Sequence, residues 1–317
     1  MKVIDKINSR DKTLFSIEIV PPLRGNNIEG IYKRIDQLIE FDPAFINITY
    51  HKDEAVYTTL KNGNVKKRTL SKRPGTVALT ASIMNKYKVE VVPHLTCGGF
   101  TRDQAENALI DLNFMGIENL LVLQGDAGHK QTHFVAEPDG HTNAVELVEQ
   151  VVDMNNGKYL DSKLEQPYPS NFCVGVAGYP EKHYAAADLD SDIQYLKAKV
   201  LAGADYIVTQ MFFDNKYYYE FVDKCRAEGI SVPIIPGLKP IALINQINIL
   251  PKLFHTHIPD DLTDEIKKCK DNKQALEVGT RWSIEQAKDL MKNGAPVLHF
   301  YTLGAGNSIR KIAQEIF

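Results

Sequence analysis

Several polar residues that could exchange protons or hold a ligand lie at or near the ends of short apolar runs. They are Glu18, Thr49, Tyr50, His94, Gln124, Asp126, Tyr179, His183 and Gln210. Asp126 is the clearest case, because it follows Gly125 just after Leu120–Leu123, an apolar run that predicts a strand buried on both faces. In parallel α/β proteins the loops after the strands converge on one crevice, where a fixed carboxylate could tune a bound group. A Gly-Asp turn that merely precedes a helix is the alternative.

The elements that would position these residues alternate along the chain. Strand-like segments are expected at Thr13–Val20, Phe45–Thr49, Val89–Leu95, Leu120–Leu123, Phe172–Ala177, Tyr206–Gln210, Pro233–Pro236 and Val297–Leu303. Helical patterns separate them at Ile28–Phe41, Val77–Tyr87, Thr101–Gly116, Asn143–Met154, Leu189–Leu201, Asp214–Arg226, up to about Asn293, and at Ser308–Phe317. This alternation predicts an α/β fold, a single (β/α)8 TIM barrel over residues 1–317, with its site on the loops after the strands. An open doubly wound sheet is the alternative.

Composition excludes several classes of partner. Lys+Arg 37 against Asp+Glu 40 gives a net charge of -3, so no general nucleic-acid or membrane attraction is expected. Four scattered cysteines without a C-x-x-C pair are typical of a reduced, cytoplasmic protein. The N-terminal residues lack the apolar core of a signal peptide, and no later run is long enough to span a bilayer.

A polar, basic segment over Asp53–Arg73 contains Lys66-Lys67-Arg68. It is expected to be a long solvated loop, and a lid over an anionic ligand is the alternative.

Metal binding is one possibility for the site. Asp126, His129 and His133 have a ligand-like D-x-x-H-x-x-x-H spacing, and His94 could add a fourth ligand. Both His129 and His133 fall in a segment of loop composition, where this spacing does not bring side chains to one face. We therefore expect no metal site.

An organic cofactor is the second possibility. No G-x-G-x-x-G opens a βαβ unit, and Gly304-Ala305-Gly306 stands too close to Phe317 for a nucleotide domain to follow. A Rossmann domain is therefore not expected. A dinucleotide could still lie across the barrel loops, with its phosphates met by backbone amides and by Lys199.

A series of motifs narrows this choice. The motifs are FSIEIVPP at Phe15–Pro22, NITY at Asn47–Tyr50, PHLTC at Pro93–Cys97, LQGD at Leu123–Asp126, VAGYPEKH at Val176–His183, TQMFFD at Thr209–Asp214 and HFYTL at His299–Leu303. In this order they resemble the 5,10-methylenetetrahydrofolate reductase family, whose members are flavoproteins on a (β/α)8 barrel. The resemblance covers essentially the whole chain.

The resemblance implies an enzyme that reduces 5,10-methylenetetrahydrofolate to 5-methyltetrahydrofolate with FAD and with NADH or NADPH, in one-carbon metabolism and methionine synthesis. It also implies a homo-oligomer. Glu18 matches the catalytic acid, and Asp126 matches an acid beside the flavin. The FAD-contacting positions are matched by Thr49, Tyr50, His94, Gln124, Gly125, Asp126, Ala144, Tyr179, His183, Asp192 and Lys199. Gln210 and Tyr301 match substrate-binding positions.

Two of these residues have a simpler interpretation. Glu18 could be a paired core glutamate, and His94 a core histidine. Two other classes of protein also stay open: a metal-dependent barrel hydrolase, and a catalytically silent flavin- or folate-binding protein.

The chain departs from the family pattern at several positions. Gln124 replaces the arginine of L-R-G-D, and His51-Lys52 replaces a small pair. Tyr195 and Ala198 replace cofactor-contacting residues of some members, and Ala305 replaces an arginine that assists folate binding. These departures leave the details of phosphate and folate-tail binding open, but they do not affect Glu18, Asp126 or Gln210.

Overall fold

A computed structural model describes residues 1–125, 133–303 and 306–317 of the chain. Within these ranges, parallel strands close into a barrel in the order β1, β10, β9, β8, β7, β6, β5, β2. Their bounds are β1 (Leu14–Ile19), β2 (Phe45–Ile48), β5 (Glu90–Thr96), β6 (Asn119–Leu123), β7 (Cys173–Gly178), β8 (Tyr206–Met211), β9 (Ile234–Leu238) and β10 (Val297–Tyr301). The predicted (β/α)8 TIM barrel is confirmed.

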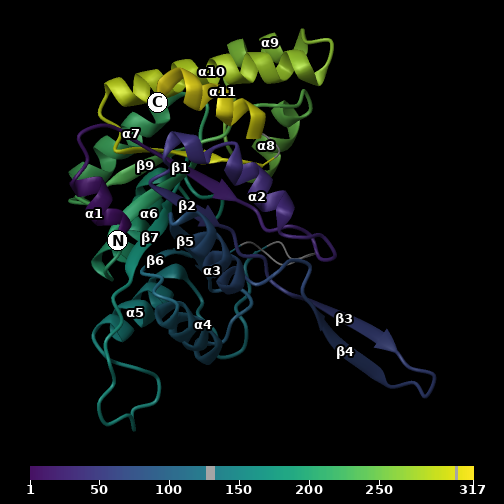
Figure 1. The fold of residues 1–317 in the computed structure, drawn as a ribbon, viewed down its shortest axis with the longest axis vertical. Helices are drawn as coiled ribbons and strands as arrows, with labels where there is room; N and C mark the ends of the chain where they lie inside the picture. Colours follow the sequence, from purple (N-terminus) through teal and green to yellow (C-terminus); the bar gives the residue numbers. More distant parts are fainter. Residues whose placement is uncertain (126–132, 304–305) are drawn as a thin grey trace.

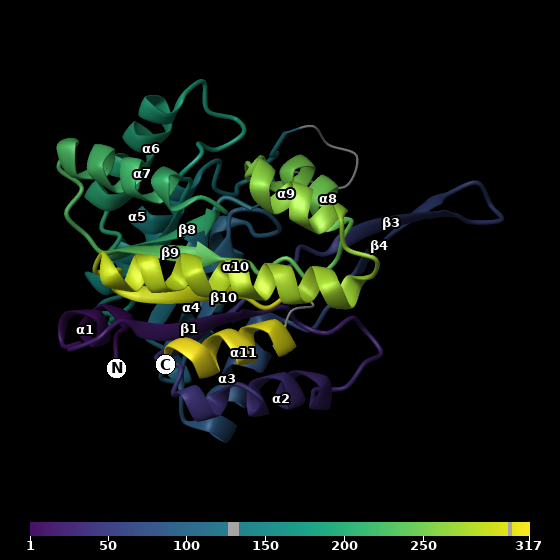
Figure 2. The same cartoon turned by 90° about the horizontal axis from the view of Figure 1, so that it is seen from above.

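Helices surround the barrel (Figures 1 and 2). They are α1 (Val3–Asn8), α2 (Glu29–Asp36), α3 (Thr76–Tyr87), α4 (Arg102–Phe114), α5 (Ala144–Asn155), α6 (Leu189–Leu201), α7 (Asn215–Ala227), α8 (Gln246–Phe254), α9 (Asp260–Lys267), α10 (Asn272–Lys292) and α11 (Gly306–Ile316). The predicted cap of α4 is present as a capping box: Thr101 Oγ1 accepts from Gln104 N at 3.2 Å, and Gln104 Oε1 accepts from Thr101 N at 2.9 Å.

Alternation along the strands separates an outer core from the barrel interior. In β1, Phe15, Ile17 and Ile19 belong to the large cluster beneath the helices. Because side chains alternate between the two faces of a strand, Ser16 and Glu18 point into the barrel. The same alternation turns interior residues of the other strands toward one axis.

The amino-terminal end of the barrel is closed by apolar packing. Val3 and Ile7 of α1 share a buried cluster with interior residues such as Phe45 and Tyr206. Val3 N also donates to the buried Asn119 Oδ1 at 2.7 Å. With this end sealed, the polar interior positions near the carboxyl ends of the strands are left to form a site.

The expectation of a solvated loop over Asp53–Arg73 was wrong. Strands β3 (Glu54–Thr59) and β4 (Val65–Leu70) pair antiparallel as a separate sheet, which projects from the barrel (Figures 1 and 2). The alternating β-formers before Asn62-Gly63 favour this hairpin, and Gly63 adopts a φ of 83° in its turn. The basic residues of β4 made the segment resemble a solvated loop in the sequence.

The helix expected over Ile28–Phe41 is shorter than predicted. α2 ends at Asp36, and a 3-10 turn, η1 (Ile39–Phe41), follows it. Leu38 leaves the helical conformation with a φ of -122° and is fully buried there, so burial of one side chain outweighs continued helical periodicity.

In the part of the chain that the structure describes, no helix combines the length and apolar character needed to cross a membrane.

Candidate active site

A cavity of about 1320 Å³ opens at the carboxyl ends of the barrel strands. Among its lining residues are Glu18, Thr49, Tyr50, His94, Gln124, Gly125, Ala144, Tyr179, His183, Asp192, Lys199, Gln210 and Tyr301. Every predicted site residue that the structure describes therefore contributes to the same cavity. Asp126 lies outside the described residues, as do His129 and Ala305.

Glu18 stands in the floor of this cavity, near the end of β1. Its neighbours across the ladders are Asn47 of β2 and Tyr301 of β10. Only 8% of the residue is exposed. Burial raises the pKa of its carboxyl to about 8, since the charged form loses its hydration. At neutral pH the cavity therefore holds a carboxylic acid that can donate a proton.

His94 of β5 lies beside this acid. Its Nε2 is 3.6 Å from Glu18 Oε2, and the ring is nearly buried. Burial lowers the pKa of His94 to about 3, with smaller contributions from His299 and His51. The histidine is therefore neutral at physiological pH, and the pair is neutral acid beside neutral imidazole.

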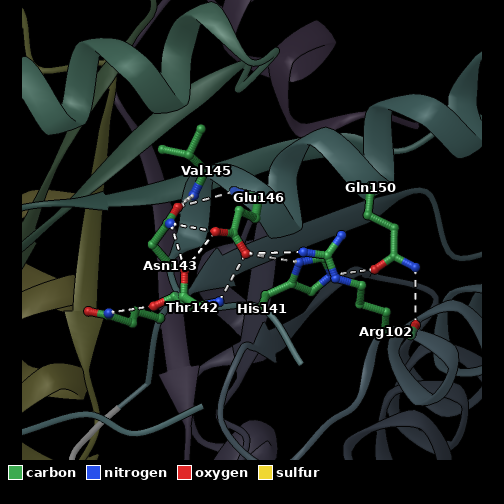
Figure 3. Close-up of polar contacts among 8 residues, drawn as sticks. Arg102, His141, Thr142, Asn143, Val145, Glu146 and Gln150 are labelled. Carbon is green, nitrogen blue, oxygen red and sulfur yellow. Dashed lines mark hydrogen bonds and ion pairs between the residues drawn. The ribbon is translucent and has the colours of Figure 1, made fainter. Parts of the chain in front are cut away.

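The wall made by α5 is held by a hydrogen-bonded network shown in Figure 3. Gln124 Nε2 donates to Thr142 O at 3.1 Å, which links the end of β6 to the segment before α5. Glu146 accepts from Thr142 N at 3.0 Å and from Thr142 Oγ1 at 2.6 Å. Asn143 caps the helix by accepting from Val145 N at 3.0 Å. These bonds fix the backbone at Ala144, which lines the cavity.

The neighbouring β7 and α6 place a cation beside this wall. Lys199 of α6 donates from Nζ to Ala177 O at 2.6 Å. Burial lowers the pKa of Lys199 to about 8, and nearby Asp192 opposes the shift. Asp192 also accepts from His183 N at 2.9 Å, so the same carboxylate orients the loop after β7.

Gln210 and Tyr301 both line the cavity near the point where β8 is irregular. The ladder between β8 and β9 shifts register between Val208 and Met211. Gln210 Oε1 accepts from Met211 N at 2.9 Å, and Tyr301 Oη donates to Thr209 O at 2.6 Å. Rotation of the Gln210 side chain would release its amide to a ligand without altering the strand.

The sequence reasoning missed contributors to the site. Lys52, just before the hairpin, and Tyr57, in the middle of β3, line the cavity. Asn47 was not predicted as a site residue, although it is fully buried beside Glu18 and His94. An asparagine at an interior position of an apolar strand was the signal that could have drawn attention to it.

Among the residues that the structure describes, no group of three or more His, Cys, Asp or Glu side chains could hold a metal ion.

Comparison with known proteins identifies the family. The family model described as methylenetetrahydrofolate reductase matches residues 3–316. Methylenetetrahydrofolate reductase (NADH) 1 of Arabidopsis thaliana is 33% identical over 329 residues, covering 100% of this chain and 51% of the relative. The 5,10-methylenetetrahydrofolate reductase of Escherichia coli is 28% identical over 291 residues, covering 91% of this chain and 85% of the relative.

A solved structure shares the fold. A Clostridium thermocellum protein described as binding two copies of 5-methyl-5,6,7,8-tetrahydrofolic acid matches with a TM-score of 0.60 at 17% identity, covering 98% of each chain. The chain spans about half the length of the plant relatives that it matches. The match to the family model over nearly the whole sequence is decisive: the chain belongs to the methylenetetrahydrofolate reductase family.

Proposed function

We propose that this protein reduces 5,10-methylenetetrahydrofolate to 5-methyltetrahydrofolate, with FAD as cofactor and a reduced nicotinamide dinucleotide as hydride donor. The observation that carries the proposal is Glu18, a carboxyl kept protonated near neutral pH in the floor of a large cavity. The names of the relatives supply the substrate, and they include both NADH and NADPH as donors.

Glu18 has a specific task in this reaction. The methylene bridge of the folate must open to an iminium before it can accept a hydride, and the departing nitrogen then needs a proton. A neutral carboxyl in reach of that nitrogen acts as a general acid. A pKa of about 8 keeps most of the group protonated at pH 7, so it suits this role.

The residues of the cavity fit FAD. When bound, FAD would carry the hydride between nicotinamide and folate. Lys199 offers a partly desolvated cation for a phosphate, and Thr49 Oγ1 is buried without a hydrogen-bond partner among the described residues. Gly125 has a φ of 92°, and a Cβ there would contact Thr96, so the backbone leaves room for close approach of a ring.

Substrate binding is assigned to Gln210 and Tyr301. Nicotinamide and folate would use one flavin face in turn. The side-chain amide of Gln210, once rotated away from Met211 N, could hydrogen-bond to either of them. Asp126 is proposed, on the family resemblance, as the acid beside the flavin.

A spectrum and two rates test the proposal. The purified protein should show flavin absorption that NADH or NADPH bleaches and methylenetetrahydrofolate restores. In stopped-flow measurements, Glu18→Gln should slow the folate half-reaction by about a hundredfold or more, because glutamine cannot deliver the proton. Flavin reduction by the nicotinamide should stay within roughly tenfold, since no leaving nitrogen takes part.

Glu181→Gln is the matched control. Burial also raises the pKa of Glu181, but this carboxylate bonds to Thr256 and His257 and does not line the cavity. Glu181→Gln should keep the folate half-reaction within roughly tenfold. Equal losses in both half-reactions of Glu18→Gln would make Glu18 structural, and a colourless protein that cannot take up FAD would reject the cofactor.

The proposal extends to one domain over residues 1–317, to the cytoplasm and to a homo-oligomer. Cys97, Cys173, Cys225 and Cys269 are all free in the described structure, which supports a reducing compartment. Light scattering of the purified protein measures the state of association.

A further inference from the structure

Asn47 is a fully buried amide in the barrel interior, one layer of residues from the cavity. It pairs in register with Glu18 of β1 and with Val92 of β5. It is absent from the cavity lining, so it does not meet a ligand there. Its surroundings are otherwise built from apolar strands, and a buried amide in such a place is retained only at a cost in stability.

The side-chain amide of Asn47 has one polar contact, with the ring of His94. Asn47 Nδ2 lies 3.4 Å from His94 Nε2, while Asn47 Oδ1 is buried with no hydrogen-bond partner among the described residues. With the amide in this orientation Nδ2 donates and His94 Nε2 accepts, whereas the opposite orientation would place Oδ1 on an Nε2–H. In the first orientation the proton of the neutral imidazole sits on Nδ1.

This tautomer matters because the same Nε2 faces Glu18 Oε2 at 3.6 Å. The single lone pair of Nε2 is taken by the Asn47 donor, so in this tautomer His94 has no hydrogen to give to the Glu18 carboxylate and the ionised form gains no stabilisation from it. A hydrogen on Nε2 would instead donate to the carboxylate and favour the ionised form. The separation of 3.6 Å is longer than a hydrogen bond, and a small rotation of either side chain would bring a hydrogen on Nε2 within reach of the carboxylate.

We propose that Asn47 is a positioning residue for the acid step: by donating to His94 Nε2 it holds His94 as the Nδ1–H tautomer, which keeps the Glu18 carboxyl protonated between turnovers. The inference rests on the proposed function of Glu18. In this inference the protonation state of Glu18 depends on Asn47, a residue that does not line the cavity.

Other ionisable groups face this pair. His299 and His51 act on His94, and Tyr301 interacts with Glu18. Burial lowers the pKa of His299 to about 3, and burial raises that of Tyr301 well above its usual value, so both are neutral near pH 7. Neither group changes its charge near pH 7, so the tautomer of His94 is the property that a substitution of Asn47 should alter.

The first test reads the tautomer directly. Nitrogen NMR of the protein labelled with ¹⁵N-histidine distinguishes a protonated Nδ1 from a protonated Nε2, and His94→Gln assigns the signal. The parent should show Nδ1–H at His94. Asn47→Leu, which keeps the volume and removes both amide groups, should shift the signal toward Nε2–H. A parent with Nε2–H would overturn the inference.

The second test reads the acid. The folate half-reaction slows as pH rises above the pKa of its acid, so its alkaline limb reports Glu18. In Asn47→Leu the pKa of this alkaline limb should fall by about one pH unit or more. The rate should then be roughly tenfold lower than that of the parent at pH values above the limb, and close to the parent rate at lower pH. Flavin reduction by nicotinamide should not change.

Thr80→Val is the control for a lost buried hydrogen bond. Thr80 is fully buried in α3, outside the barrel interior, and donates from Oγ1 to Thr76 O at 2.8 Å. Its variant should leave the limb in place. An unmoved limb in Asn47→Leu, or an equal loss at every pH, would overturn the inference. A parent that never oxidises its flavin with the folate would instead reject the proposed function, and the NMR result would still decide the tautomer.

Discussion

At the scale of single residues, burial decides the protonation states in the cavity. Burial raises the pKa of Glu18 to about 8 and lowers that of Lys199 to about 8. The pKa of His94 falls to about 3 for the same reason. In each case loss of hydration disfavours the charged form, so Glu18 and His94 are mostly neutral near pH 7, whereas Lys199 is still mostly charged.

Glu18 should make stability depend on pH with a definite sign. Its folded-state pKa, about 8, lies above the ordinary value of 4.5, so the folded state binds the extra proton between these pH values. The free energy of unfolding then falls as pH rises through this window, by at most about 1.4 kcal/mol per unit. Urea unfolding of the cofactor-free parent and Glu18→Gln at pH 5.5 and 8.5 should show the variant gaining relative stability at the higher pH. A constant difference would mean that Glu18 titrates as an ordinary carboxyl.

At the scale of elements, close backbone approach determines where the strand ends lie. Gly279 of α10 faces the chain just after β9, and a Cβ there would lie 2.0 Å from Ile241 O. Backbone cannot move aside as a flexible side chain can. This contact therefore sets how closely α10 packs on the barrel.

Gly279→Ala and Gly30→Ala form a matched pair of helical substitutions. Gly279→Ala should lower the free energy of unfolding by about 1–3 kcal/mol, because it overpacks a fixed backbone contact. Gly30 of α2 has nothing within 4 Å of its would-be Cβ, so Gly30→Ala should raise stability by about 0.5–1 kcal/mol. Denaturant midpoints measure both. Similar effects in the two variants would contradict the assigned contact.

The hairpin β3–β4 is an element whose charge can act at a distance. It projects from the barrel (Figure 1). Glu54 and Tyr57 of β3 line the cavity. Replacing Lys66, Lys67 and Arg68 by glutamine should slow capture of anionic substrates and flatten its dependence on salt, while turnover changes little. Stopped-flow binding at several ionic strengths measures this. The same change at Lys288, Lys292 and Lys311, on α10 and α11, is the control. Equal salt dependence of the capture rate in the parent and the hairpin variant would mean that the hairpin charges do not steer the substrate.

At the scale of the whole molecule, the cavity exists only in the closed barrel. Its walls come from residues as distant as Glu18 and Leu303, and pairing of β1 with β10 joins them. A ligand that binds this cavity binds the folded state alone and stabilises it by mass action.

FAD should therefore stabilise the entire protein. At a concentration about a hundredfold above its Kd, FAD should raise the free energy of unfolding by about 2.7 kcal/mol. Thermal unfolding of cofactor-free protein across an FAD titration measures this, with riboflavin as a control that lacks the phosphates near Lys199. A midpoint that ignores FAD would remove the cofactor from the proposal.

The sequence by itself determined the barrel and most of the candidate site. Apolar runs such as Leu120–Leu123 are local signals, and their order along the chain is sufficient to predict a parallel barrel. Polar residues at the ends of such runs must meet at one mouth, which is why Glu18, His94 and Gln210 could be placed together in advance.

Only the tertiary structure decided how those residues act. The pKa of Glu18, the contact of His94 with Asn47 and the packing of Gly279 on Ile241 depend on atoms brought together from different elements. The hairpin was missed although Asn62-Gly63 marks its turn, because the charge of β4 suggested solvation and the two strands stabilise each other only when paired. Periodicity reports which face of a segment is buried, whereas protonation and hydrogen-bond direction depend on what that face meets.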